Sequence, residues 1–564
     1  MIGTTSIILY FILHLELITA VNLETDGSES PVINTESGLV RGLTTYTANG
    51  KTVDVFWGIP YAESPTGHLR FQRPQRKEPW EGVLNATTKP NSCFQTIQSS
   101  FANFSGATIW ITKTSQSEDC LYLNIWVPHP QPQNATVMVW IHGGGFYSGS
   151  STLDIYDGGI LSSEENVIVV SMNYRVASLG FLYFNRSDAP GNVGLFDQLM
   201  ALEWINKNIV YFGGDSGKVT IFGESAGASS VSLHLLSPLS KGLFNNAIME
   251  SGSILNSWSF HDRETAINQG LLLAEAVNCS HDPRDLDSTM ECLRNADPLH
   301  LVKVDWIGFN FSDFLFTPVI DGIFLLDIPE TLLNENTTKR QNLLVGNNQN
   351  EGSYFLVYYF PEILKEEQVG VTRKQFHKLV EKVIPDANNF QRKAIIHQYT
   401  DWLEEDNTYN NRDMLIGMMG DKFITCDTNE FAYKYAERGN DVFMYFFTHT
   451  PSVSSWPRWI GATHGDEISF VFGAPLNPLL DYSTGEQELA RRIMKHWTNF
   501  ARTGNPSIVF EDLNKTIHWP KYTTRGRHYL TLDTHAITVG KGPRAQQCAF
   551  WKLFYPSLFE TTCV

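Results

Sequence analysis

A serine nucleophile is the chemistry to which the sequence points first, because Gly-Glu-Ser-Ala-Gly at residues 223–227 has the spacing of a nucleophile elbow. An apolar run at residues 219–222 leads directly into it, and helical spacing follows at residues 228–236. This order of strand, sharp turn and helix lifts a serine hydroxyl clear of a sheet, and the small residues permit the strained turn. The context therefore favours Ser225 as the nucleophile of an acyl transfer over an ordinary turn serine.

A glycine-rich loop upstream offers backbone donors for the negative charge that such a reaction develops. Three consecutive glycines, residues 143–145, follow an apolar run at residues 137–141. Glycines let backbone amides approach a ligand without obstruction by side chains, whereas the alternative is a flexible surface turn. The position of the loop ahead of the elbow favours an oxyanion hole formed by the amides of Gly144, Gly145 and Ala226.

The base and the acid that the serine needs are expected after Ser225, because on this type of fold the chain order is serine, acid, histidine. Glu351 stands in a polar loop at the end of an apolar run, and it is preferred over Asp321, which has the context of a turn residue. His464 lies in a loop of small residues and is the preferred base. By sequence alone, three other histidines compete with it: His234, His261 and His300.

The elements that must position these residues alternate along the chain. Short runs that are apolar on both faces recur at residues 137–141, 167–171, 219–222 and 343–345, with helical spacing between them, as at residues 196–206. Such strands belong to a mostly parallel sheet that helices cover on both sides. We therefore predict an α/β-hydrolase fold with a large, mostly parallel central sheet, in which the polar, helical residues 378–427 are an insertion and not a separate domain.

The charge of the chain limits its partners. Lys and Arg number 42 and Asp and Glu number 60, which gives a formal net charge of −18 among 564 residues. This charge argues against nucleic acids and anionic membrane surfaces as partners. A small cationic substrate would suit it, although acidity that serves only solubility is the commoner explanation. None of the chemistry above calls for a cofactor or a metal.

The N-terminus predicts export from the cell. Residues 7–13 are apolar, and we expect residues 1–20 to be a signal peptide, residues 21–555 the catalytic domain and residues 556–564 a short tail. No later run is long and apolar enough to be a transmembrane anchor, and the C-terminus lacks the hydrophobic tail of a lipid-anchor signal. We expect a secreted, extracellular glycoprotein. Eight sequons are consistent with this, at Asn85, Asn103, Asn134, Asn185, Asn278, Asn310, Asn336 and Asn514.

The seven cysteines fit disulfides in a secreted protein. Proximity along the chain suggests Cys93–Cys120 and Cys279–Cys292, and these leave Cys426–Cys548 as the third pair. Cys563 is then odd. It is expected either to join a second copy in a disulfide-linked homodimer or to be a free or trimmed thiol.

The chain resembles the cholinesterase branch of the type-B carboxylesterases from residue 34 to residue 551. The matching strings are long and specific, at residues 117–124, 222–227, 351–355 and 464–468. The resemblance implies a deep active-site gorge and hydrolysis of acetylcholine to choline and acetate through an acetyl-serine intermediate, without a cofactor. It also implies the triad Ser225, Glu351 and His464, the oxyanion amides named above and the same three disulfides.

The resemblance implies a site for a choline head. That group carries a permanent charge and no N–H, so its suitable receptor is an aromatic face assisted by negative charge. The choline-binding tryptophan of the family corresponds to Trp110, the second aromatic wall to Tyr354 and the acidic neighbour to Glu224. A single tryptophan is more often a core residue, but the loop position of Trp110 between Cys93 and Cys120 favours the binding role.

The acyl pocket resembles the family less closely. Trp258, Phe314 and Phe355 match pocket positions, whereas Ser312 stands where vertebrate members carry a bulky phenylalanine. Phe311 is the neighbour that would fill the gap. We therefore expect a preference for acetyl esters with some tolerance for larger acyl groups.

The rim of the implied gorge departs further. Tyr147 and Tyr358 match the peripheral tyrosines, but Thr96 and Gln98 stand where typical members have a tyrosine and an aspartate. Loss of that carboxylate predicts weak inhibition by peripheral-site ligands and little inhibition by excess substrate. Asp466, where the family commonly has tyrosine, changes the contacts behind the histidine.

Three alternatives use the same fold. A broader carboxylesterase would prefer neutral esters, and Trp110 and Tyr354 argue against it. A scavenger of choline esters or organophosphates would share the chemistry and differ in its physiological role. A cholinesterase-like adhesion protein would usually lack a triad member, and this chain lacks none.

Overall fold

The structure, a computed structural model, describes residues 30–96, 105–304, 314–334, 341–360, 369–510, 515–535 and 537–560. Several predicted features lie outside the described residues: the signal peptide, Gln98, Asn103, Asn310, Phe311, Ser312, Asn336, Asn514 and Cys563. Within the described ranges, no helix combines the length and the apolar character needed to cross a membrane.

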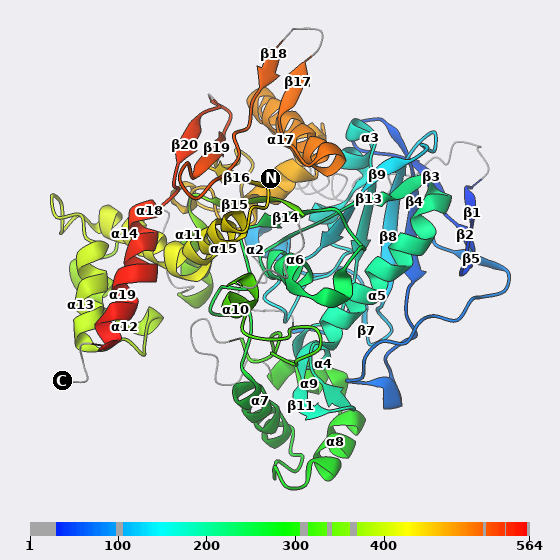
Figure 1. The fold of residues 1–564 in the computed structure, drawn as a ribbon, viewed down its shortest axis with the longest axis horizontal. Coiled ribbons are helices and arrows are strands. Elements are labelled where there is room, and N and C mark those ends of the chain that lie inside the picture. The colour runs from blue at the N-terminus through cyan, green and yellow to red at the C-terminus, as the bar shows by residue number, and fades with distance from the viewer. Residues whose placement is uncertain are drawn as a thin grey trace, which may run out of the picture.

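An eleven-stranded sheet runs through the molecule (Figure 1). Its strands lie in the order β20 (Val539–Lys541), β19 (His528–Leu532), β16 (Val442–Phe447), β15 (Asn342–Asn348), β14 (Asn246–Glu250), β13 (Gly214–Glu224), β9 (Ala135–Ile141), β10 (Ile168–Met172), β8 (Tyr122–Pro128), β4 (Thr52–Pro60) and β3 (Leu43–Tyr46). Neighbours from β19 through to β10 pair in parallel, and the strands at both edges pair antiparallel. The predicted large, mostly parallel sheet is confirmed.

Each face of the sheet has its own apolar core, because side chains alternate along a strand. On β9, Val137 and Val139 enter one core, whereas Met138 and Trp140 enter the other, and all four are fully buried. The first core contains α5 (Val193–Asn208) and α6 (Ala226–Leu236), and the second contains α3 (Gly159–Glu165) and α17 (Thr484–Thr503). Helices thus pack on both faces of the sheet. The predicted site lies where strands of this sheet end.

The other described elements surround this sandwich. The further helices are α2 (Ser105–Thr108), α4 (Ala177–Phe181), α7 (Arg263–Ala276), α8 (Leu286–Asn295), α9 (Pro298–Val304), α10 (Pro329–Asn334), α11 (Glu351–Tyr359), α16 (Asp466–Val471), α18 (Ala545–Ala549) and α19 (Tyr555–Glu560). The small sheets pair β1 (Val32–Thr35), β2 (Gly38–Arg41) and β5 (Val83–Asn85), then β6 (Ser92–Cys93) with β7 (Gln116–Ser117), β11 (Tyr183–Arg186) with β12 (Ala189–Pro190), and β17 (Ile508–Phe510) with β18 (Lys515–Ile517).

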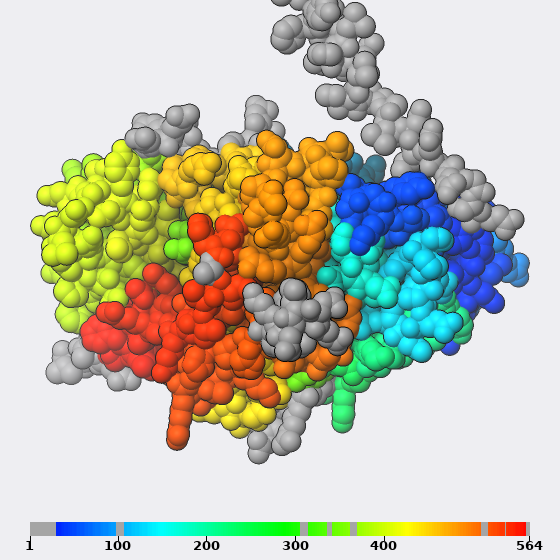
Figure 2. Space-filling view, turned by 90° about the horizontal axis from the view of Figure 1, so that it is seen from above, coloured from blue at the N-terminus to red at the C-terminus, as the bar shows by residue number. Residues whose placement is uncertain are grey.

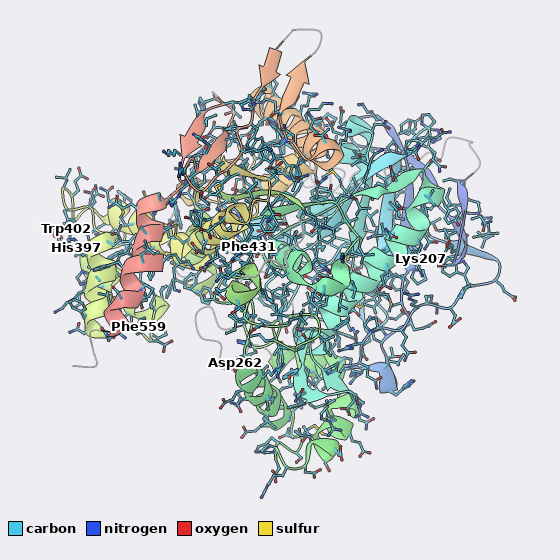
Figure 3. The ribbon with its side chains drawn as sticks, in the orientation of Figure 1. Lys207, Asp262, His397, Trp402, Phe431 and Phe559 are labelled. Carbon is cyan, nitrogen blue, oxygen red and sulfur yellow. A yellow bond between two sulfur atoms is a disulfide. The ribbon has the colours of Figure 1, made fainter. Side chains whose placement is uncertain are left out.

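The polar region predicted as helical forms one end of the molecule, next to the C-terminal helix α19 (Figures 1 and 2). It contains α12 (Arg373–Val383), α13 (Asn389–Gln398) and α14 (Thr408–Gly420). The next helix, α15 (Cys426–Glu437), lies back against β15 and β16. Capping boxes start α12 and α13, since Thr372 with Gln375 and Asn388 with Gln391 satisfy free amides at the helix ends. Figure 3 shows Trp402 and Phe559 at this end, far from Lys207 on α5.

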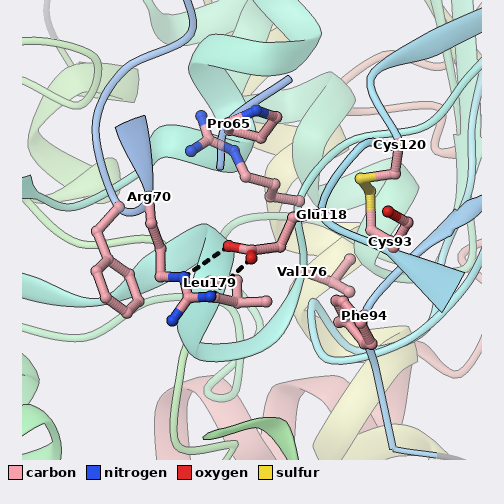
Figure 4. A pocket seen from close by; sticks show the side chains of 11 residues that line it. Pro65, Arg70, Cys93, Phe94, Glu118, Cys120, Val176 and Leu179 are labelled. Carbon is pink, nitrogen blue, oxygen red and sulfur yellow. Dashed lines mark hydrogen bonds and ion pairs between the residues drawn. A yellow bond between two sulfur atoms is a disulfide. The ribbon is translucent and has the colours of Figure 1, made fainter. Parts of the chain in front are cut away.

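Three disulfides join the expected pairs: Cys93–Cys120, Cys279–Cys292 and Cys426–Cys548. The first closes the loop that contains Trp110, and the partly buried ion pair of Arg70 and Glu118 lies beside it (Figure 4). Arg70 donates from Nε and a terminal nitrogen to the two carboxylate oxygens of Glu118, at 2.6 and 2.7 Å. This bidentate pair and the disulfide together anchor both ends of the loop.

The described sequon asparagines are all exposed: Asn85, Asn134, Asn185 and Asn278. Exposure is what a glycan requires of its attachment site. Modification of these asparagines stays a prediction.

Candidate active site

Ser225 stands at the turn between β13 and α6, in the strained backbone that an elbow requires. Its φ of 57° and ψ of −121° are unfavourable for a residue with a side chain. The chain packs tightly around it, since a Cβ on Gly227 would lie 2.0 Å from the Ile141 carbonyl oxygen. The Ser225 amide donates to the Glu250 carbonyl at 2.9 Å. Contacts with β9 and β14, the two strands next to β13, therefore hold the turn in place.

The glycine loop follows β9 and reaches the same point. Gly144 and Gly145 have φ values of 105° and 59°, which favour glycine, and Gly144 accepts a hydrogen bond from the Tyr147 amide at 3.1 Å. Ala226 is the first residue of α6, where amides have no acceptor within the helix. Gly144 and Gly145 line one cavity with Ser225. The predicted oxyanion residues thus meet at the predicted nucleophile.

His464 contacts Glu351, which lies 113 positions earlier in the sequence. Its Nδ1 lies 2.7 Å from Glu351 Oε2, and the other oxygen of Glu351 accepts the Asn348 amide at 2.6 Å. Both carboxylate oxygens are therefore occupied in a side chain that is only 1% exposed. Glu351 was expected on a loop, but it is the first residue of α11, because the helix begins directly after the end of β15.

The other nitrogen of the imidazole faces Glu224 in this structure. His464 Nε2 lies 3.0 Å from Glu224 Oε1. Within the described residues, no hydrogen bond joins His464 to the Ser225 hydroxyl, although the two side chains line the same cavity. Hydrogen bonds of this kind are often long before substrate binds. Glu224 was expected only as a neighbour of the cation site, and its pairing with the histidine is a second contact that the sequence did not indicate.

The rival residues lie elsewhere. Asp321 Oδ1 accepts three backbone amides of its own turn, from Ile323, Phe324 and Leu325, as its sequence context indicated. His234 is fully buried against Ser240 and Gln198. His261 Nε2 lies 2.7 Å from the Phe314 carbonyl oxygen, and His300 is exposed.

Buried acids alter the proton affinities around His464. Burial disfavours the charged imidazole, but Glu224 and Glu351 outweigh it and raise the pKa of His464 well above its ordinary value. Burial also raises the pKa of Glu224, and it raises the pKa values of Asp466 and Glu467 to about 8. The charge on the histidine therefore depends on how many of these acids are ionised.

Aromatic rings form part of the wall of the cavity that contains Ser225. Tyr354 stacks on Tyr358 with ring centroids 4.2 Å apart and lies 5.7 Å from the His464 ring. Trp110 packs on the histidine loop, since a Cβ on Gly465 would lie 2.9 Å from the indole ring. Trp110, Tyr147 and Tyr354 line both this cavity and a second one that also reaches Thr96 and Tyr358. The two cavities thus share an aromatic wall.

The residues predicted for the acyl pocket line the same cavity. Trp258 and Phe314 meet edge to face with centroids 5.7 Å apart, and Phe355 lies 5.2 Å from the His464 ring. The Trp258 indole donates to the Phe423 carbonyl at 2.8 Å, which fixes its orientation. All three line the cavity that contains Ser225.

Some residues of the site were not predicted. Tyr156 and Leu153 line the cavity although no local pattern marks them. Asn348 is 1% exposed and donates from its side chain to the Thr463 carbonyl at 2.7 Å and to Glu467 Oε2 at 2.5 Å. Its signal in the sequence was present, since it belongs to the polar run that follows the apolar residues 343–345.

The carboxylesterase family model matches residues 29–551 of this chain. A cholinesterase of Mus musculus is 44% identical over 557 residues, which cover 98% of this chain and 91% of the relative. An acetylcholinesterase of Electrophorus electricus and one of Bungarus fasciatus are each 43% identical to this chain. Both matches cover 94% of this chain, and they cover 89% of the first relative and 87% of the second. With the elbow, the glycine loop and the histidine in one cavity, these matches show that the chain belongs to the carboxylesterase family, as a serine hydrolase of its cholinesterase branch.

Proposed function

We propose that the chain hydrolyses acetylcholine to choline and acetate through an acetyl-serine intermediate. The observation that carries the proposal is one cavity that contains Ser225, His464, the glycine loop, Trp110 and Tyr354. A serine nucleophile with a base serves any ester. The aromatic wall beside Glu224 is what favours a cationic leaving group.

In the first half of the reaction, the ester carbonyl lies at Ser225 with its oxygen toward the amides of Gly144, Gly145 and Ala226. The serine hydroxyl replaces Glu224 as the partner of His464 Nε2, which accepts the proton as the oxygen attacks. Glu351 stabilises the charged imidazole and holds its Nδ1 proton. The amides stabilise the tetrahedral oxyanion, and its collapse expels choline, which takes the proton from Nε2.

In the second half, water attacks the acetyl-serine with His464 again as the base. The same amides stabilise the second oxyanion, and acetate leaves as the Ser225 oxygen regains its proton. Apart from the ester and the attacking water, the groups used in these steps are side chains and backbone amides of this chain.

Replacing Trp110 with alanine is expected to lower kcat/KM for acetylthiocholine by at least about 10-fold, mainly through KM, because a desolvated cation–π contact is lost. Hydrolysis of the uncharged analogue, in which carbon replaces the ammonium nitrogen, should change by no more than a few fold. Trp402→Ala, which alters a tryptophan that is 55% exposed, is the control. Equal losses for the charged and uncharged substrates would remove Trp110 from the cation site.

The acyl side is tested by comparing acetylthiocholine, butyrylthiocholine and a neutral ester of matched acyl length. Because Trp258, Phe314 and Phe355 line the space beside Ser225, we expect acetyl to be the best acyl group and butyryl turnover to be slower but measurable. Undetectable butyryl turnover would exclude the expected tolerance. A neutral ester preferred over its choline counterpart would favour a broader carboxylesterase.

A further inference from the structure

A buried glutamate that the reaction above does not use lies directly beneath the nucleophile. Glu250 is the last residue of β14 and pairs in register with Glu224 on β13. Its carbonyl accepts the Ser225 amide at 2.9 Å. Its backbone therefore positions the elbow, and its side chain must be accommodated next to the acids of the active site.

The carboxyl group of Glu250 is poorly supplied with hydrogen-bond donors. The residue is 0% exposed, and Oε1 accepts from the Trp497 indole at 2.7 Å. Oε2 is buried and has no hydrogen-bond partner among the described residues. A buried carboxylate with one neutral donor is strongly disfavoured relative to the neutral acid.

The groups that face Glu250 from the neighbouring elements add negative charge. They are Glu224 on β13 and Glu467 on α16, with the neutral phenols of Tyr156 and Tyr445. Glu467 is much better supplied with donors, since it accepts from Ser251, Tyr445 and Asn348 at 3.1, 3.3 and 2.5 Å. When two buried acids lie close together, the one with fewer donors keeps the proton.

We infer that Glu250 is a positioning residue that holds a buried proton beneath Ser225, and that as a neutral acid it limits the negative charge that acts on Glu224 and His464. The inference rests on the proposed roles of Ser225 and His464. Burial first and the Glu467 charge second also raise the pKa of Glu250 well above its ordinary value. The carboxylates in contact with His464 are those of Glu224 and Glu351. A neutral Glu250 adds no further negative charge beside Glu224.

The retained proton has a predictable effect on stability. The folded protein keeps a proton on Glu250 that the unfolded chain, with an ordinary pKa near 4.5, has already released. The contribution of Glu250 to the stability of the folded protein is therefore fully present when the pH is below the unfolded pKa. It is lost progressively as the pH rises toward the folded pKa. A glutamine at this position has no proton to lose.

The test uses the full-length E250Q variant, with E486Q as a matched control. Glu486 is also 0% exposed, but although burial opposes its charge, hydrogen bonds from Ser452 and Ser483 and a contact with His449 hold its pKa at about 2. Apparent Tm is measured between about pH 5 and pH 9. We expect E250Q to gain several degrees over the wild type as the pH rises, whereas E486Q should be destabilised by an amount that stays constant with pH.

Two further measurements separate this role from a merely structural one. In the pH profile of kcat/KM, the acid limb should stay in place in E250Q, because a neutral acid is exchanged for a neutral amide. A shift of that limb by about one unit toward lower pH would show that a negative charge was removed, and would overturn the inference. In infrared spectra, one protonated-carboxyl band that shifts in D₂O should be present in the wild type and absent from E250Q.

A second variant covers the case in which E250Q does not fold. Trp497→Phe removes the one donor to the Glu250 carboxyl group among the described residues. Its effect on Tm should be independent of pH if Glu250 is neutral, and should grow with pH if Glu250 is charged. The Tm and infrared measurements do not require esterase activity. An inactive wild type would refute the proposed function, whereas a pH-independent Tm difference in E250Q would refute the buried proton.

Discussion

Replacing Ser225 with alanine is expected to lower kcat for acetylthiocholine by at least about 10⁴-fold, since the step that forms the covalent intermediate is lost. The oxyanion amides and the aromatic wall remain, so substrate should still bind with little change in affinity. Stopped assays on the purified protein measure the turnover. Titration with an organophosphate should find one reactive site per wild-type chain and none in the variant.

A serine one helical turn away provides the control for this substitution. Ser229 is also fully buried, its amide donates to the Ser225 carbonyl at 2.9 Å, and its hydroxyl has no hydrogen-bond partner among the described residues. Ser229→Ala should therefore leave kcat within a few fold. If Ser225→Ala retained near-native turnover, the nucleophile would have to be another residue and the whole mechanism would be wrong.

Replacing Glu351 with glutamine is expected to lower kcat by about 10⁴-fold, the effect of the equivalent acid-to-amide change in a serine protease. The amide keeps an acceptor for the Asn348 N–H. It can also present an N–H group to His464 Nδ1, which favours the tautomer with its proton on Nε2 and so blocks proton acceptance from Ser225. A pH profile should show that higher pH does not restore the rate.

The rival acid is the matched control for Glu351. Asp321→Asn keeps the acceptor oxygen that its turn uses, and it should leave kcat unchanged. Loss of turnover in Asp321→Asn together with normal turnover in Glu351→Gln would exchange the two assignments. Loss in both would require a measurement of Tm to separate chemistry from folding.

Local patterns carried most of what the sequence revealed about the fold and the centre of the site. The apolar run before residue 223 and the small residues after it specify strand, turn and helix within a dozen positions, so Ser225 was recognisable without a structure. The alternation of two-sided apolar runs with helices likewise predicted the sheet. Glycines 143–145 were recognisable because few other residues tolerate the φ values of that loop.

Contacts between distant segments could not be predicted in the same way. The pairing of Glu224 with Glu250 follows from the parallel register of β13 with β14, and nothing near either residue specifies that register. The second contact of His464, with Glu224, depends on where a loop 240 positions later places its ring. Asn348 acts through three partners, and only one of them lies near it in sequence.

The left-handed backbone at Ser225 implies that the position of the nucleophile lowers the stability of the folded protein. A non-glycine residue held at such angles costs about 1 to 3 kcal/mol, and glycine would occupy them without that cost. A Ser225→Gly variant is therefore expected to be more stable than the wild type and to be inactive toward esters. The reactive hydroxyl and the stability of this turn thus place opposite demands on one position.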